Sequence, residues 1–355
     1  MKNFISHLKV IDLSSVLAGP SVAMYFAELG ADVTKIEHPI HKDVTRSWKL
    51  SNEDASNPIS AYFSSINYKK NYKSLNLKNE DHRLQLLELC ENADILIMNF
   101  KKGDQKKFGI EDEVLHGINP KLIVAKINGY GEESDRVAYD LILQAETGFM
   151  SMNGTPNSGP VKMPVALIDV LAGHQLKEGI LQALLNRTIS NEGATVTVSL
   201  YEAAIASLVN QASNYLMNKH IPQRIGSLHP NIAPYGEIFK TKDNQLITFA
   251  IGNNNQFKDL CIFLNLGKMS SDERFSTNTA RIEHRNSLAS LWEAKILTLE
   301  SEEILKFCLT KHIPAGVIKD LEKVFQNRKA QEMIRKEKIS GISTQRVSSV
   351  AYKIK

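Results

Sequence analysis

The alternation of strand-like and helix-like segments in the first 130 residues is the feature that most restricts the fold of this chain. Short apolar runs, typical of buried strands, alternate with segments in which apolar residues recur at helical spacing. We expect strands at residues 10–13, 32–36, 72–77, 95–98 and 122–127, and helices at residues 21–29 and 80–90. Helices between successive strands connect parallel strands, so the pattern predicts an α/β fold with a doubly wound parallel sheet.

The rest of the chain continues this pattern and then changes. We expect a turn-rich loop at residues 153–164, a long helix from about 170 to 185, a strand at 195–198 and a helix at 203–217. Prolines and glycines between residues 222 and 234 mark a linker to a second region, where strands at 237–240 and 246–250 precede several helices. The segment from residue 319 onward carries ten basic and four acidic residues and is predicted to be a solvated helix and a terminal strand. A chain of 355 residues is too long for one small core, which favours two domains.

Charge and cysteine content exclude several classes of protein. The formal net charge of +4 is too small to indicate a nucleic-acid partner. Cys90, Cys261 and Cys308 are widely spaced and form no CxxC pair, so we expect neither a disulfide framework nor a metal site, and a reducing cytoplasm fits best. The first residues lack the apolar core of a signal peptide, and no apolar run reaches 18 residues, so we expect a cytoplasmic protein with no membrane partner.

The first strand–helix–strand unit resembles a dinucleotide-binding unit, but its turn has the wrong residues. Glu37 follows Gly19 by 18 residues, close to the place of a ribose-binding acid. However, the turn holds a single glycine, and Pro20 removes a backbone N–H that a pyrophosphate would use. The sequence also lacks the GxxxxGK[ST] phosphate loop. A dehydrogenase is therefore disfavoured.

Asp169 interrupts the apolar run of residues 165–172, where an ionised carboxylate is costly to desolvate. Two interpretations stay open. Asp169 caps the helix that begins at about residue 170, or it is a nucleophile kept ionised by the positive end of that helix. The two roles are compatible with each other.

Several short motifs follow one another in a specific order over residues 8–335. They are Val16-Leu17-Ala18-Gly19-Pro20, Leu29-Gly30-Ala31-Asp32-Val33, Lys35-Ile36-Glu37, Asn67 with Lys70, Asn99-Phe100-Lys101-Lys102-Gly103, Gly129-Tyr130-Gly131, Tyr139-Asp140, Gly159-Pro160-Val161-Lys162, Asp169-Val170-Leu171-Ala172-Gly173, His229-Pro230-Asn231, Arg274-Phe275 and Ile313-Pro314-Ala315-Gly316. Together they resemble the family III CoA-transferases, the group that includes formyl-CoA and carnitine CoA-transferases. The resemblance implies a large Rossmann-like domain at residues 1–220, completed by residues 325–355, with linkers and a smaller inserted α+β domain at 221–324. It also implies an interlaced homodimer.

The resemblance further implies an activity and a set of site residues. Asp169 matches the family's catalytic aspartate, whose carboxylate takes CoA from an acyl-CoA donor as an aspartyl-CoA thioester and passes it to a carboxylic acid acceptor. CoA is then a co-substrate, and no permanently bound cofactor is expected. Lys101 and Lys102 stand where the family has Arg and Pro, which keeps positive charge but loses bidentate geometry. The residues implied to bind CoA or to stabilise the reacting oxyanion are Val16, Ala18, His38, Lys70, Asn99, Lys101, Lys107, Gly129, Tyr130 and Tyr139.

Two alternatives share this fold. One is an α-methylacyl-CoA racemase, which moves the C2 proton with a His–Asp pair. In this chain Tyr139 stands at the histidine position, and a phenol that titrates near pH 10 is no ready base at pH 7. The other is a non-catalytic acyl-CoA-binding homologue, against which the presence of Asp169 argues. Small carboxylic or dicarboxylic acids, with succinyl-CoA or acetyl-CoA as donor, are the default substrates.

Overall fold

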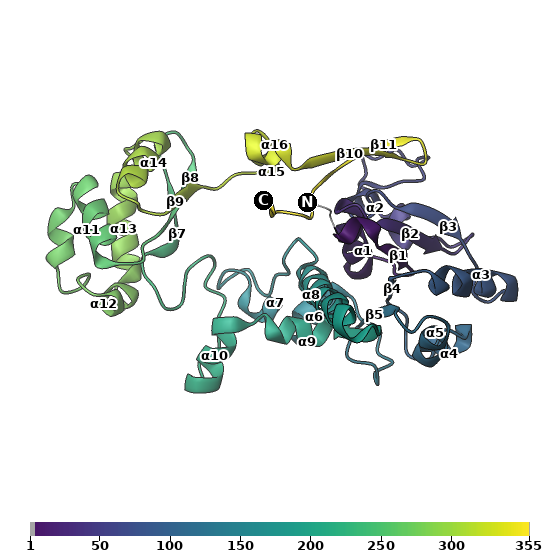
Figure 1. The fold of residues 1–355 in the computed structure, drawn as a ribbon. Helices are drawn as coiled ribbons and strands as arrows, with labels where there is room; N and C mark the ends of the chain where they lie inside the picture. The colour runs from purple at the N-terminus through teal and green to yellow at the C-terminus, as the bar shows by residue number, and fades with distance from the viewer. Residues whose placement is uncertain (1–3, 355) are drawn as a thin grey trace. The chain divides into compact units, whose positions relative to one another are not determined.

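The computed structural model describes residues 4–354, which divide into two compact units (Figure 1). The first unit holds the chain up to Gly154, Ser158–Arg224 and the chain from Glu332 onward. The second unit holds Thr155–Asn157 and Ile225–Gln331. The first unit is therefore built from segments that precede and follow the second unit in the sequence.

A six-stranded sheet with the order β3-β2-β1-β4-β5-β6 forms the centre of the first unit. All neighbouring strands are parallel, which confirms the predicted α/β fold with a parallel sheet. The strand order reverses between β1 and β4, and open parallel sheets bind ligands outside the carboxyl ends of the strands at such a point. The strands are β1 (Lys9–Asp12), β2 (Asp32–Glu37), β3 (Asn71–Ser74), β4 (Ile95–Met98), β5 (Ile123–Asn128) and β6 (Ala194–Ser199).

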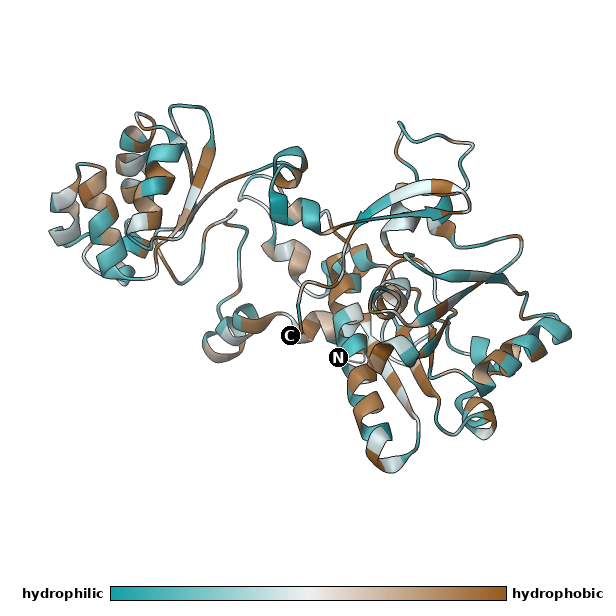
Figure 2. Cartoon of the chain, turned by 45° about the horizontal axis from the view of Figure 1, so that its top comes forward, coloured by the Kyte–Doolittle hydropathy of each residue, from teal (hydrophilic) through white to brown (hydrophobic). Residues whose placement is uncertain are grey.

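Helices cover both faces of this sheet. On one face α1 (Ala18–Glu28), α8 (Leu167–Ser190) and α9 (Leu200–Ala206) pack on a core that includes Val10. On the other face α3 (Glu80–Glu91) and α5 (Asp112–Ile118) pack on a core that includes Ile11. Because successive side chains of a strand point to opposite faces, burial of both faces requires the continuous apolar runs seen in the sequence (Figure 2).

Shorter elements complete the first unit. They are η1 (Phe4–His7), η2 (Val44–Ser47), α2 (Ala61–Ser65), α4 (Asp104–Phe108), α6 (Asp140–Glu146), α7 (Phe149–Met152) and α10 (Val209–Asn218). The prediction of one helix at residues 203–217 is wrong, because α9 ends at Ala206 and α10 begins at Val209. Val209 has a φ of 44°, which a helix cannot continue through.

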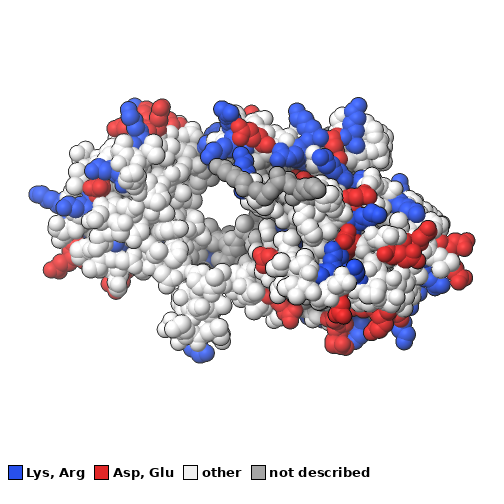
Figure 3. Space-filling model, viewed as in Figure 1, with Lys and Arg blue, Asp and Glu red and all other residues white. Residues whose placement is uncertain are grey.

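The C-terminal segment of the first unit is an antiparallel hairpin of β10 (Ile334–Ile339) and β11 (Ile342–Val347). Lysine and arginine side chains gather over it in Figure 3, and Lys336 and Lys338 are exposed, as predicted for a solvated basic segment. Arg346 differs, because it is buried and pairs with Glu28 of α1. This buried ion pair therefore attaches the hairpin to α1.

The second unit has its own core around Trp292 and a three-stranded antiparallel sheet. The sheet consists of β7 (Tyr235–Lys240), β8 (Leu246–Ala250) and β9 (Ala315–Val317), which confirms the two strands expected at 237–240 and 246–250. Its helices are α11 (Asn254–Phe263), η3 (Gly267–Ser271), α12 (Asn278–Glu283), α13 (Arg285–Ile296), α14 (Ser301–Thr310) and α15 (Leu321–Phe325), and α16 (Arg328–Glu332) ends at the boundary with the first unit.

Three further observations concern the residues that the structure describes. Within residues 4–354, no helix combines the length and the apolar character that a membrane crossing requires. In the same range, no three His, Cys, Asp or Glu side chains come together as a metal site would require. The thiols of Cys90, Cys261 and Cys308 are free and buried.

Candidate active site

A pocket of about 350 Å³ lies at the carboxyl end of the sheet, among the loops that follow β1, β4 and β5. These strands end at Asp12, Met98 and Asn128. The pocket therefore occupies the place where the strand order reverses. The predicted site residues that line it are Val16, Ala18, Asn99, Lys101, Gly129, Tyr139 and Asp169.

Asp169 lies in the first turn of α8 and is not its cap. The capping interpretation is wrong because α8 begins at Leu167, two residues before Asp169. The N-cap is Ala166, whose side chain cannot accept a hydrogen bond. Asp140 of α6 takes over this role, since its Oδ1 accepts a hydrogen bond of 2.8 Å from the backbone N–H of Ile168. The carboxylate of Asp169 is thereby left free for another use.

Burial makes ionisation of Asp169 costly. Its side chain is only 8% exposed, and among residues 4–354 no group donates a hydrogen bond to its carboxylate. Burial, with a smaller contribution from the like charge of Asp140, raises the pKa of Asp169 to about 7. At neutral pH an appreciable fraction of this carboxylate is ionised without a hydrogen-bond donor to quench it. A carboxylate in this state has the properties that a nucleophile requires, and the N-terminal end of α8 favours its charged form.

Close packing of two helices brings Asp169 to the N-terminal end of α1. A Cβ atom at Gly173, one turn after Asp169, would lie 3.1 Å from Ser21 Oγ and 3.5 Å from the carbonyl oxygen of Ala18. Glycine therefore allows α8 to approach α1 more closely than a larger residue would. The backbone of Ala18 and the side chain of Asp169 consequently share one pocket.

The loop between β1 and α1 forms one wall of this pocket and is held in a strained conformation. Val16 has a φ of 72°, a left-handed conformation that is unfavourable for a β-branched residue. The side chain of Asn99 binds both the backbone N–H and the backbone carbonyl of Ser15, the residue before Val16. Its Oδ1 accepts from Ser15 N at 3.0 Å, and its Nδ2 donates to Ser15 O at 2.9 Å.

Ion pairs connect the segments around the pocket mouth. Lys102, beside Lys101, donates to the carbonyl oxygen of Glu133 at 2.9 Å and to its Oε2 at 3.0 Å. Arg136 stacks on the ring of Tyr130 at 4.0 Å and binds Glu146 at 2.6 Å. These pairs are exposed, so they are weak and sensitive to salt.

Four of the predicted site residues do not line the pocket. His38 accepts hydrogen bonds from the backbone of residues 40 and 41, and its ring stacks on His41. Lys107 is exposed on α4, and Tyr130 donates to Glu146. Lys70 is buried and binds Asp12, 58 residues earlier in the chain. For these residues, contact with CoA stays a prediction.

Sequence reasoning missed two acids that shape the site. Asp140 was named only as part of a motif, although it caps α8 and lies close enough to Asp169 to raise its pKa. Asp12 interrupts an apolar strand, which is the same signal that singled out Asp169, and it is completely buried. A search for every acid inside an apolar run would have found Asp12. Asp140 offers no such signal in the sequence.

Comparison with known proteins gives a consistent family. The family model described as CoA-transferase family III matches residues 5–350. A protein of Agrobacterium fabrum named succinate–glutarate CoA-transferase is 36% identical over 333 residues, which are 92% of this chain and 83% of that protein. An Acetobacter aceti protein named acetyl-CoA:oxalate CoA-transferase is 33% identical and aligns with 88% of this chain and 80% of its own length. The crystal structure of a CaiB/BaiF family protein from Brucella suis superposes with a TM-score of 0.84 at 32% identity, over 99% of this chain and 93% of that one.

Proposed function

Because this chain belongs to CoA-transferase family III and is thus a CoA-transferase, we propose that it carries CoA between two acids on Asp169. The carboxylate of Asp169 attacks the carbonyl carbon of the donor acyl-CoA and expels CoA thiolate, which gives a mixed anhydride. The thiolate then attacks the aspartyl carbonyl, forms an aspartyl-CoA thioester and releases the donor carboxylate. The acceptor carboxylate attacks this thioester, and the same two steps in reverse give the new acyl-CoA and regenerate the aspartate.

The observation that carries this proposal is the state of the Asp169 side chain. It lines the pocket, is almost fully buried, and receives no hydrogen bond from any described residue. A purely structural aspartate at this depth would be paired or hydrogen-bonded, because an uncompensated buried carboxylate destabilises the fold. Retention of such a carboxylate in a pocket is expected where it reacts.

The surroundings of the pocket support CoA as the co-substrate. Lys101 is exposed at the pocket, where its ammonium group is available to a phosphate of CoA. The loop of Val16 and Ala18 provides a backbone wall for the pantetheine arm. Gly129 follows β5, and a Cβ there would lie 2.4 Å from the Cβ of Ala138, so the residue must be glycine for the loop to close. Its backbone N–H is one candidate donor to the oxyanion.

Short dicarboxylic acids are the proposed substrates, with succinyl-CoA as donor and glutarate as acceptor. The names of two relatives support this choice, the Agrobacterium fabrum protein and a 33% identical mouse protein named succinyl-CoA:glutarate CoA-transferase. The pocket volume of about 350 Å³ suits a small acyl group at the end of the pantetheine arm.

The proposed assembly is an interlaced homodimer. Helix α10 supports it, because none of its residues is buried and its apolar side chains are strongly exposed. Val209, Leu216 and Met217 are 72%, 67% and 80% exposed. A second copy of the chain would remove this apolar surface from water. Light scattering coupled to gel filtration tests this, and a mass of about 40 kDa at micromolar concentration contradicts the dimer.

The mechanism is tested by mass spectrometry of the protein incubated with succinyl-CoA. We expect CoA attached to the peptide that contains Asp169 in the wild type and in the Glu88→Gln control, whose carboxylate is exposed on α3. Asp169→Asn should bind CoA but form no adduct and no glutaryl-CoA. Glutaryl-CoA production by Asp169→Asn at the wild-type rate would refute the assignment of the nucleophile. Deuterium uptake at C2 of a branched acyl-CoA in D₂O, without any adduct, would favour the racemase alternative.

A further inference from the structure

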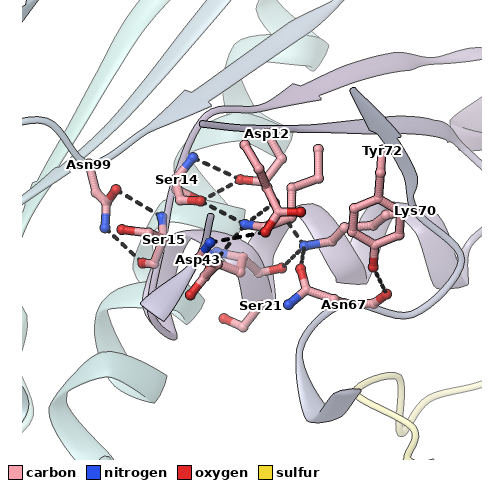
Figure 4. A network of polar contacts seen from close by, with 12 residues as sticks. Asp12, Ser14, Ser15, Ser21, Asp43, Asn67, Lys70, Tyr72 and Asn99 are labelled. Atoms are coloured by element: carbon pink, nitrogen blue, oxygen red, sulfur yellow. Dashed lines mark hydrogen bonds and ion pairs between the residues drawn. The ribbon is translucent and has the colours of Figure 1, made fainter. Parts of the chain in front are cut away.

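Four charged side chains are buried together next to the loop between β1 and α1, and Figure 4 labels Asp12, Asp43 and Lys70 among them. Asp12, Lys35, Asp43 and Lys70 are each less than 8% exposed. Asp12 Oδ2 lies 2.8 Å from Lys70 Nζ and 3.6 Å from Lys35 Nζ, and Lys35 Nζ lies 3.1 Å from Asp43 Oδ2. Two carboxylates and two ammonium groups therefore neutralise one another in a site without access to solvent.

Lys70 uses all of its donors within the protein. Its Nζ donates at 2.8 Å to Asp12 Oδ2, to Asn67 Oδ1 and to the carbonyl oxygen of Pro20. A lysine ammonium group has three N–H bonds, so none remains for a ligand. Lys70 consequently has neither the exposure nor the free donor that contact with a phosphate of CoA requires.

The two lysines hold the backbone on both sides of the pocket loop, at Ser14 just after β1 and at Pro20 in the first turn of α1. Lys35 Nζ donates to the carbonyl oxygen of Ser14 at 2.8 Å, and Lys70 Nζ donates to that of Pro20. Val16, whose backbone is strained, lies between these two anchored carbonyls and lines the pocket. A strained residue keeps its conformation only where its surroundings hold it in place. The buried cluster provides this restraint through its hydrogen bonds to Ser14 and Pro20. Asn99 adds to it through its two hydrogen bonds with the backbone of Ser15.

The attraction between opposite charges opposes burial and keeps Asp12 and Lys70 ionised at neutral pH. Burial alone would raise the pKa of Asp12, but Lys35 and Lys70 together lower it to about 2. Burial lowers the pKa of Lys70 to about 8, although Asp12 opposes this effect. Both groups are therefore charged at pH 7, and the removal of either one leaves an uncompensated buried charge.

We propose that Lys70 and Lys35 are positioning residues for CoA transfer, which hold the loop between β1 and α1, together with the first turn of α1, in the shape that receives CoA. Lys70 thus acts on CoA through the carbonyl of Pro20 and makes no contact with a phosphate. This inference rests on the proposed function for its relevance to catalysis. It is testable by CoA binding alone, because the loop that it concerns is a wall of the pocket.

The first experiment compares CoA binding by the wild type and by Lys70→Met at several salt concentrations. A positioning residue predicts a dissociation constant at least tenfold higher, with an unchanged slope of its logarithm against the logarithm of the salt concentration. A direct phosphate contact predicts a shallower slope in the variant, because one ion pair with the ligand is lost. The control is Lys78→Met, which removes an exposed lysine near β3 and should leave both the affinity and the slope unchanged. Unchanged affinity or a shallower slope in Lys70→Met overturns the proposal.

A second variant keeps the test valid if Lys70→Met does not fold. The double variant Asp12→Asn with Lys70→Met removes one charge of each sign and leaves the pair of Lys35 and Asp43 in place. We expect it to unfold in urea near the wild-type midpoint, because no charge is left unpaired. Its CoA affinity should stay at least tenfold weaker, since the carbonyl of Pro20 still lacks its donor. Recovery of wild-type affinity in the double variant would show that Lys70 serves stability alone and would overturn the proposal.

The proposed function and this inference fail in distinguishable ways. A wild type that binds CoA but forms no adduct on Asp169 refutes the covalent mechanism, and the comparison of CoA affinities still decides the role of Lys70. If the adduct does form, the same variants are assayed for glutaryl-CoA production from succinyl-CoA and from succinyl-pantetheine, which lacks every phosphate. Positioning predicts the same fold-loss of kcat/KM with both donors. A loss confined to succinyl-CoA would overturn it.

Discussion

Replacement of Asp169 by asparagine should make the protein more stable at alkaline pH. Burial raises the pKa of this carboxyl from 3.8 to about 7. The folded state therefore binds a proton that the unfolded state has already lost between these two pH values, so the wild type loses stability as the pH rises from about 4 to about 7. Each pKa unit corresponds to about 1.4 kcal/mol, so the full cost is about 4 kcal/mol. Asparagine has a similar size and carries no charge, and it avoids this cost.

Urea unfolding, followed by far-ultraviolet circular dichroism at several pH values, measures this effect. Asp169→Asn should exceed the wild type by about 2 kcal/mol at pH 5 and by about 4 kcal/mol at pH 8. Glu88→Gln, which removes an exposed carboxylate, should stay within about 0.5 kcal/mol of the wild type at both pH values. A variant that is no more stable than the wild type at pH 8, or a difference that does not grow with pH, would refute the claim that Asp169 is held at an energetic cost.

Three other predictions concern catalysis, ligand binding and stability. First, kcat/KM of the wild type should rise about tenfold per pH unit below pH 7 and then level off. Asp140→Asn should move this rise to lower pH, because it removes the like charge beside Asp169. A pH profile that does not move in Asp140→Asn contradicts the coupling of the two carboxylates. Second, Lys101→Ala should raise KM for succinyl-CoA several-fold at low salt and much less at 0.5 M salt. An equal increase in KM at both salt concentrations would contradict a contact between Lys101 and a phosphate of CoA. Third, Arg346→Ala should lower the free energy of unfolding by about 3–5 kcal/mol, because it leaves Glu28 buried without its partner; urea unfolding checks this, with the exposed Lys353→Ala as control.

The central strands of the parallel sheet were predictable because β1, β4 and β5 are short, mainly apolar runs that are buried on both faces. The runs at residues 10–13, 32–36, 95–98 and 122–127 each correspond to a strand of the sheet. Helix ends were less predictable. The helical pattern predicted a start of α8 at about residue 170, whereas α8 begins at Leu167 and its cap comes from Asp140, a residue 28 positions earlier than Ile168. No local pattern carries that information.

The candidate site shows the same limit. The order of motifs identified the family and singled out Asp169, which lines the pocket together with six of the residues predicted beside it. The partners of Lys70 could not be read from the sequence, because Asp12 lies 58 residues earlier, at the end of β1, whereas Lys70 directly precedes β3. A lysine in a polar segment looks like a surface charge until the pairing of β1, β2 and β3 places it under the loop. Buried ion clusters of this kind depend on tertiary structure alone.

The contact of the C-terminal hairpin with α1 imposes an order of events during synthesis on the ribosome. Glu28 receives Arg346 only after a further 318 residues have been added, and Tyr25 meets Tyr352 after 327. At about 5–20 residues per second, the nascent α1 waits roughly 15–65 s for these partners. During that interval the second unit emerges complete, since it lies between the two halves of the contact. The first unit therefore completes these contacts only after the whole of the second unit has been synthesised.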